Sequence, residues 1–116
     1  MMKWLQEVAK RYKRQKTEST MPAEVHVVRL GDVAMATCPF EYYLDFGIQI
    51  KVRSPAVQTF LVQLAGKGTY VPSPRSVQGG GYGSIPANNP VGPEGGQQLA
   101  DYIVKTMRFL WGREVK

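Results

Sequence analysis

The stretch from Val33 to Gly47 restricts the possible folds of this chain more than any other part of the sequence. It opens with a short apolar run, Val33 to Thr37, that favours a strand, and the Cys38-Pro39 pair then interrupts it. Glu41 follows at the point where a helical pattern begins. In α/β folds, a tight turn between a strand and a helix opens onto a crevice and holds a side chain there. Glu41 is therefore the first candidate functional residue.

Glu41 also has a purely structural explanation. A glutamate in the first turn of a helix is stabilised by the positive end of the helix dipole, which is a common reason to find one there. The helix that would start here carries Phe40, Leu44 and Ile48 on one face. Ser54-Pro55 ends it, because proline disfavours the helical conformation of the residue before it. Both explanations of Glu41 stay open at the level of the sequence.

The neighbouring segments predict a mixed sheet. Glu24 to Leu30 is rich in β-branched residues, and Gly31-Asp32 is a turn signal before the return strand at Val33 to Thr37, which together predict a hairpin. Val57 to Ala65 predicts a further strand, parallel to its neighbour because a helix connects the two. We therefore expect an α/β (α+β) fold, with a three-stranded mixed sheet made of a hairpin and a parallel neighbour, and with flanking helices.

A long segment rich in glycine and proline follows the predicted sheet. No helix or strand is expected in residues 66–96, and such loops are either functional or disordered. Function is the better interpretation, because Tyr70, Tyr82 and other apolar residues are anchors that a disordered linker lacks. The run from Gly79 to Gly83 permits a ligand to approach the backbone, but it lacks the strand-before, helix-after setting of dinucleotide and P-loop motifs.

Amphipathic helices are predicted at both ends of the chain and are expected to pack on the sheet. Residues 1–16 carry six basic residues and one acid, which is +5 of the formal net charge of +6. We interpret this helix as a solvated basic face over an apolar seam, with contact to a membrane surface or to nucleic acid as the alternatives. No nucleic-acid readout motif follows it. Gln97 to Trp111 forms the last helix, and Gly112 is its stop.

Few residues of this chain can bind a metal or form a disulfide. Cys38 is the single cysteine, which excludes an internal disulfide and a multi-cysteine zinc site. His26 is the only histidine, and no partner lies near it at metal-ligand spacing. A length of 116 residues allows one domain, and no apolar run approaches the roughly 18 to 20 residues of a transmembrane segment.

Several short motifs occur in a characteristic order over about residues 24 to 105. They are Leu30-Gly31-Asp32-Val33-Ala34, Pro39-Phe40-Glu41, Tyr70, Tyr82 and Gly92-Pro93-Glu94-Gly95-Gly96. In this order they resemble the later part of the amidase domain of the neutral ceramidase family, as found in uncharacterised bacterial relatives. The resemblance implies a zinc-dependent hydrolase of an N-acyl amide bond, acting on an N-acyl amide or lipid-like substrate, and an exported parent protein.

The resemblance also implies roles for individual residues. By position, Glu41 and Tyr70 are metal ligands, and Tyr82 assists at the substrate. The alternative for both tyrosines is loop anchoring, with half-buried rings. In the family, histidines from earlier in the domain complete the zinc site, and this chain does not contain them. Since a catalytic zinc usually has three protein ligands, we expect that the chain alone neither binds catalytic zinc tightly nor hydrolyses amides.

The expected organisation is a basic amphipathic helix at residues 1–16, followed at residues 17–116 by the C-terminal part of a ceramidase-like amidase domain that lacks its upstream segment. The alternative function is a non-catalytic interaction or oligomerisation module, in which an incomplete domain exposes apolar surface and associates with itself or with a partner. Nucleic-acid binding through residues 1–16 is the least favoured alternative, and it predicts an affinity that falls steeply with salt.

Overall fold

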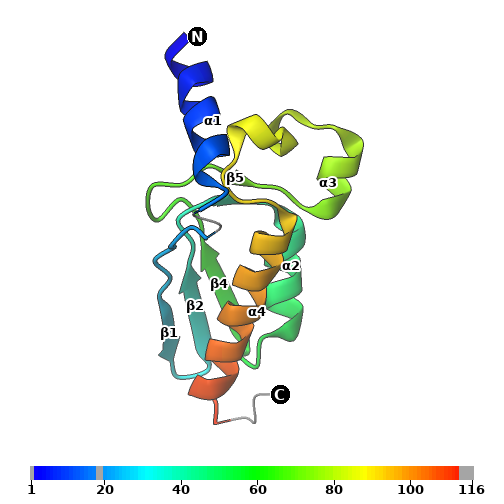
Figure 1. Cartoon of the computed structure of the whole chain (residues 1–116). Coiled ribbons are helices and arrows are strands. Elements are labelled where there is room, and N and C mark those ends of the chain that lie inside the picture. The colour runs from blue at the N-terminus through cyan, green and yellow to red at the C-terminus, as the bar shows by residue number, and fades with distance from the viewer. Residues whose placement is uncertain (1, 18–19, 113–116) are drawn as a thin grey trace.

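The computed structural model describes residues 2–17 and 20–112. Residue 1 of the predicted first helix, residues 18–19 and the C-terminal residues 113–116 lie outside the described residues. The chain contains both helices and strands (Figure 1). Their bounds are α1 Met2–Arg14, β1 Val27–Leu30, β2 Val33–Thr37, β3 Glu41–Tyr42, α2 Leu44–Arg53, β4 Gln58–Val62, β5 Tyr70–Val71, α3 Pro74–Gly79, the 3-10 helices η1 Tyr82–Ser84 and η2 Pro86–Asn88, and α4 Pro93–Leu110.

The predicted three-stranded mixed sheet is confirmed. β1 and β2 form an antiparallel hairpin around a turn at Gly31, where a φ of +61° favours glycine. β4 pairs with β2 in parallel, with Val33 opposite Gln58 and Thr37 opposite Val62. The strand order is β1-β2-β4, so the chain leaves the middle strand and returns beside it after α2.

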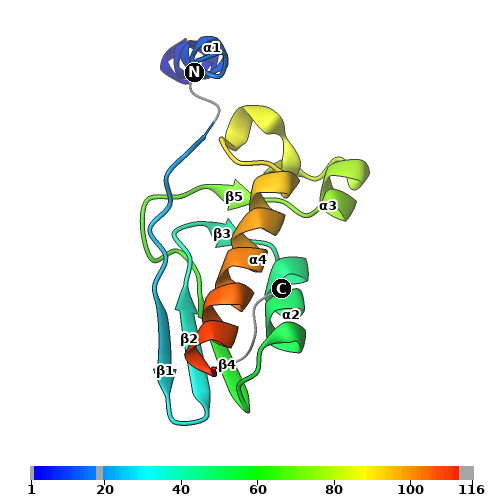
Figure 2. The same ribbon diagram turned by 60° about the horizontal axis from the view of Figure 1, so that its bottom comes forward.

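The helices α2 and α4 lie together on one face of this sheet, as both views show (Figures 1 and 2). The buried residues of α4 recur at helical spacing and form one apolar face: Gly96, Ala100, Ile103, Val104 and Met107. Phe46 and Ile50 of α2 complete the helical layer of the core. The residue after the C-cap of α4, Gly112, has a φ of +68°, which agrees with its predicted role as the helix stop.

Small residues allow the helices to pack closely. On the sheet, the central positions under the helices are Ala34 and Ala36, both completely buried. On α4, a Cβ at Gly96 would lie 2.6 Å from Cζ of Phe46 and 2.7 Å from Cγ1 of Val71, closer than real Cβ atoms come. The large side chains of this core therefore come mainly from the helices, and the sheet provides a flat surface for them.

Glu41 does not begin a helix, so the sequence prediction for this position is wrong. Glu41 and Tyr42 form the short strand β3, and α2 begins at Leu44. The amides of Glu41 and Tyr43 both donate hydrogen bonds to carbonyls of the segment 69–71. This pairing with a distant part of the chain overrides the local helical pattern.

Residues 66–96 contain more regular structure than the sequence predicts. β5, α3 and two short 3-10 helices lie within them, and α4 begins at Pro93 rather than at Gln97. Proline suits a first helical turn, because an amide at that position has no partner within the helix. Ser73 caps α3 by accepting a hydrogen bond from the amide of Ser76, 3.3 Å away.

The basic helix α1 does not pack on the sheet, which corrects the prediction for this helix. It projects from one end of the molecule (Figures 1 and 2), and none of its residues is buried. It reaches the body through Arg11, whose Nη2 donates to the carbonyl of Pro86 at 2.7 Å and to that of Ala87 at 3.2 Å. The molecule is accordingly elongated, with extents of 50, 29 and 25 Å.

Candidate functional site

The β3–β5 pair brings two of the predicted site residues together. Glu41 of β3 and Tyr70 of β5 are direct partners in the parallel register. Such partners point to the same face, and the burial pattern agrees, because Glu41 and Tyr70 are half-buried whereas Tyr42 and Val71 are buried on the other face. The carboxylate and the phenol therefore emerge from one face of the pair.

Gly68 permits this pairing. A Cβ at Gly68 would overlap the carbonyl oxygen of Pro39 and would lie 2.8 Å from Cα of Phe40, so only glycine fits where the two backbones pass. The amide of Leu64 donates to the carbonyl of Phe40 at 3.0 Å and fixes the backbone that follows the Cys38-Pro39 pair. The Cys38-Pro39 break thus serves to carry the chain from β2 into β3, opposite β5.

Tyr42 anchors the buried face of the pair. Its hydroxyl donates to the carbonyl of Gly96, and its ring stacks on Phe46 with 4.7 Å between centroids. Burial raises the pKa of this phenol far above its usual value of about 10, and so does the nearby Cys38. Tyr42 is therefore a neutral structural residue, and only the other face of the pair is accessible to a ligand.

Tyr82, the third predicted site residue, joins the cluster through the ring of Tyr70. The two ring centroids are 6.4 Å apart and the planes are nearly perpendicular, which is a favourable edge-to-face contact. Tyr82 is 73% exposed, so its outer side faces solvent. Tyr70 is the centre of the arrangement, with Glu41 beside it on β3 and Tyr82 packed against its ring.

The sequence analysis missed Tyr43 as a residue of this site, and it considered Gly83 only as part of the glycine run 79–83. The ring of Tyr43 packs edge-on against Tyr70 at 6.3 Å between centroids. A Cβ at Gly83 would lie 3.3 Å from Cγ of Tyr70 and would overlap the hydroxyl of Tyr43, so this glycine lets the loop lie on the two rings. A strand assignment for residues 41–43 would have placed Tyr43 on the face of Glu41, since alternate residues of a strand share a face.

A groove of about 460 Å³ opens beside Glu41, between β3, α2 and β4. Its apolar walls come from Leu44, Ile48 and Leu61. Lys51 also lines it, so the groove holds one carboxylate and one ammonium group. A mostly apolar cleft with a few polar groups is the usual form of a small-molecule site.

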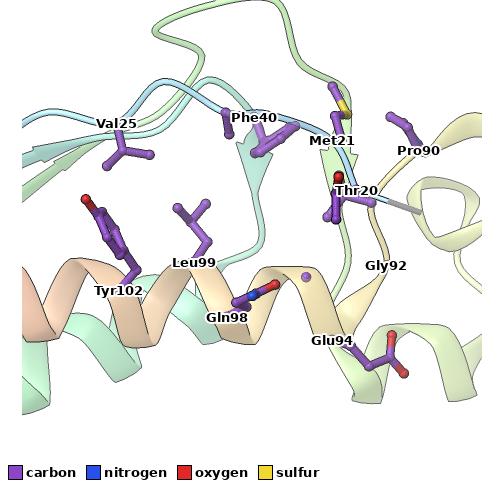
Figure 3. A pocket seen from close by; sticks show the side chains of 13 residues that line it. Thr20, Met21, Val25, Phe40, Pro90, Gly92, Glu94, Gln98, Leu99 and Tyr102 are labelled. Carbon is purple, nitrogen blue, oxygen red and sulfur yellow. The ribbon is translucent and has the colours of Figure 1, made fainter. Parts of the chain in front are cut away.

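A second groove of about 690 Å³ lies between residues 20–25 and the N-terminal half of α4. Figure 3 shows Val25, Leu99 and Tyr102 directed into it, and Glu94 directed away. None of the predicted site residues lines this groove. This groove is therefore separate from the predicted site at Glu41 and Tyr70.

The described residues offer an incomplete set of metal ligands. Within them, the Glu41 carboxylate and the Tyr70 hydroxyl form no side-chain hydrogen bond, so both oxygens are available. His26 does not join them, because its Nε2 lies 2.8 Å from Oε1 of Glu24 and both side chains are largely exposed. No group of three or more His, Cys, Asp or Glu residues at metal-binding distance occurs in residues 2–17 and 20–112.

The chain was compared with family models, curated proteins and solved structures. No family model, curated protein or solved structure matches the chain. In the described ranges, no helix combines the length and hydropathy that a membrane span requires.

Proposed function

We propose that this chain supplies two oxygen ligands, from Glu41 and Tyr70, to a ceramidase-like zinc amidase site that histidines from outside the chain complete. The observation that supports this proposal is the parallel register of β3 and β5, which pairs the two residues directly. They come from distant parts of the sequence, and Gly68 is placed so that the backbones can meet. On this proposal the chain alone is inactive on amides, because its imidazole ligands are absent.

The donor set fits one half of a catalytic zinc site. Zinc accepts carboxylate oxygen, and a catalytic site combines three protein ligands with one open position. Tyr70 is an unusual zinc ligand, because a phenol has to give up its proton to the metal before it becomes an anionic ligand. When bound, zinc would supply an activated water for hydrolysis of the amide, and Glu41 and Tyr70 would hold the ion.

The remaining residues of the site position the ligands and the substrate. Tyr43 and Tyr82 hold the ring of Tyr70 between two edge-on contacts, which restricts the direction of its hydroxyl. The groove beside Glu41 has the apolar walls that the acyl chain of an N-acyl amide would require. Lys51, on the same groove, is available to a polar or anionic group at the end of such a substrate.

Cobalt(II) with added imidazole tests this proposal, because free imidazole replaces the missing histidine ligands. The ¹⁵N-labelled chain is titrated with cobalt(II) in the presence and absence of imidazole, and the paramagnetic changes of the amide signals locate the ion. We expect the largest changes at Glu41 and Tyr70, and a tighter affinity with imidazole. Glu41→Gln and Tyr70→Phe should each weaken cobalt binding about tenfold or more.

Glu24→Gln is the matched control, because Glu24 is an exposed carboxylate beside the only histidine. This variant should leave the cobalt affinity unchanged. Paramagnetic changes centred on His26, or a cobalt affinity lowered by Glu24→Gln and not by Glu41→Gln, would contradict the proposed ligand pair.

A second candidate function, an interaction or oligomerisation module, has separate support. The face of the sheet opposite α2 and α4 carries large apolar side chains that are 37% to 67% exposed in the described part of the chain. We call this the open face, and its residues are Val28, Leu30, Met35, Phe60 and Val62. Val28, Met35 and Phe60 lie side by side across the three strands, so the exposed patch is continuous. Such patches often mark protein interaction sites.

Sedimentation velocity tests the second candidate. If the open face mediates self-association, Phe60→Ser should lower the association constant about tenfold or more, since a buried phenylalanine contributes roughly 1.5 to 3 kcal/mol. Phe109→Ser is the matched control, because Phe109 is also exposed but lies on α4. A monomer at all concentrations, or equal effects of the two substitutions, would remove this candidate.

A further inference from the structure

The helix α1 separates its apolar and basic residues completely. At 3.6 residues per turn, Met2, Trp4, Leu5, Val8, Ala9 and Tyr12 fall within an arc of about 160°. The charged residues and Gln6 occupy the rest of the circumference. Arg11 and Lys13 stand at the two margins of the apolar arc, next to Trp4 and Met2 on the helical wheel.

The rest of the described chain leaves this apolar arc largely uncovered. Met2 is 76% exposed, Tyr12 67%, Leu5 52% and Trp4 45%. Val8 and Arg11 are half-buried, which places the side that faces the body near one margin of the arc. The hydrogen bonds of Arg11 to the η2 carbonyls attach the helix at this margin. The helix thus stands away from the sheet (Figure 2), and its apolar side chains remain exposed.

From this arrangement we propose that α1 docks on the surface of a membrane that contains anionic phospholipids. A helix with a wide apolar arc that includes Trp and Leu, and with Lys and Arg on the polar side, lies in the membrane interface with its apolar face among the acyl chains. A margin cation such as Lys13 can keep its charged end at the phosphate level while its stem covers apolar surface. Each basic residue near an anionic surface adds to the affinity.

The charge pattern favours this partner over a protein groove. Residues 1–16 hold six basic residues and one acid, and the acid, Glu7, is paired with Lys10 at 3.4 Å. A groove on a second copy would have to supply compensating acids, and the open face, defined above, consists of uncharged residues. An anionic lipid surface supplies both the negative charge and the apolar interior that α1 requires.

The test is binding of the full chain to phospholipid vesicles. We use vesicles of phosphatidylcholine with about one third phosphatidylglycerol, and pure phosphatidylcholine vesicles for comparison. Trp111→Phe leaves Trp4 as the only tryptophan, so its fluorescence reports on α1 alone. We expect a blue shift of Trp4 emission and co-sedimentation with the anionic vesicles, and weaker binding at high salt. No binding to the anionic vesicles, or equal binding to both kinds, would overturn the proposal.

Leu5→Glu and Gln6→Glu form a matched pair of variants. Each adds one negative charge at neighbouring positions of α1, but only Leu5→Glu places it in the apolar arc. Leu5→Glu should lower the vesicle affinity about tenfold or more, and Gln6→Glu less than about fivefold. Because α1 has no buried residue, both variants should keep the thermal midpoint of the body.

Equal losses of vesicle affinity in the two variants would reduce the effect to net charge and overturn the proposal. The proposal also fails if the unaltered chain ignores anionic vesicles but self-associates through α1, which sedimentation velocity of Leu5→Glu detects. It fails as well if the chain binds a polyanion such as heparin without binding the vesicles. This inference is independent of Glu41 and Tyr70, so the cobalt experiment and the vesicle experiment can fail separately.

Discussion

The two faces of the β1-β2-β4 sheet differ in side-chain size and in what covers them. The face under α2 and α4 has alanines at its centre, Ala34 and Ala36, and both are completely buried. On the open face, Val28, Met35 and Phe60 lie on β1, β2 and β4 and are 37% to 49% exposed. Small residues allow the helices to pack closely, whereas large exposed ones are typical of a surface that meets a partner. The comparison teaches that apolar patterning alone does not tell which face forms the core.

Two phenylalanines test the comparison most directly. Phe46 is 2% exposed and stacks on Tyr42, whereas Phe60 on the open face is 49% exposed. Phe46→Ala should lower the free energy of unfolding by about 3 to 5 kcal/mol, and Phe60→Ala by less than about 1 kcal/mol. Urea denaturation of both variants measures the difference. Equal losses would show that the open face is buried in solution and would break the comparison.

Substitutions at two glycines test the close packing between α2 and α4 on the covered face of the sheet. Gly96→Ala should lower the free energy of unfolding by about 1 to 3 kcal/mol, because the added methyl collides with Phe46 and Val71. Gly79→Ala is the control, since a Cβ there meets nothing within 4 Å and alanine favours the helical state of α3. Thermal melts of both variants serve as the measurement. Tolerance of Gly96→Ala would mean that α4 lies further from α2 than described.

Two methionines sharpen the comparison chemically. Met35 on the open face is 37% exposed, and Met107 of α4 is fully buried. Because peroxide must reach the sulfur, Met35 should form the sulfoxide about tenfold or more faster than Met107 under native conditions. Peptide mass spectrometry over a time course gives both rates. In denaturant the two rates should become equal, and equal native rates would contradict the assigned exposure.

The smallest effect on the free energy of unfolding is expected for an ion pair on the outer side of the helical layer. Arg53 donates to the carboxylate of Asp101 at 2.7 Å, and Gln97 donates at 3.0 Å, which lowers the pKa of that carboxyl. A lowered native pKa contributes stability above the unfolded value of about 3.9, and the contribution disappears as the pH falls through the native pKa.

Asp101→Asn should therefore lower the free energy of unfolding at pH 7 by well under 1 kcal/mol, about the size expected for a largely exposed pair. The difference from the unaltered chain should vanish in strongly acidic solution. Urea denaturation across a pH series measures it. A loss that persists at acidic pH would assign the effect to helix packing instead of charge.

Much of the fold follows from local patterns. Val33 to Thr37 is a strand with the predicted bounds, and the turn at Gly31 and the stop at Gly112 lie where the sequence places them. These positions depend on neighbouring residues alone, since a left-handed φ favours glycine. Glu41 was a candidate from the strand-turn pattern, and Tyr70 and Tyr82 were named from the resemblance. The metal-binding roles of Glu41 and Tyr70 and the substrate role of Tyr82 stay predictions.

The local conformation of Glu41 was beyond the reach of such patterns. Its sequence neighbours favour a helix, but hydrogen bonds to the segment 69–71 place it in a strand. Tyr43 was missed for the same reason, because its position beside Tyr70 depends on that strand. Contacts between distant segments leave no trace in short-range periodicity, so local sequence patterns do not predict them.

The sequence by itself determined the amphipathic character of α1 and α4, the hairpin with its turn, and the supply of possible ligands, which includes a single histidine. Each of these depends on residue type and on spacing along the chain. The sequence did not determine the buried face of α2, where Phe46 and Ile50 are buried and the predicted Leu44 and Ile48 are exposed. The tertiary structure decided that Glu41 meets Tyr70, that only one face of the sheet is covered by helices, and that α1 stands apart. The physical reason is that pairing and packing between distant segments are settled by competition among all contacts of the folded chain.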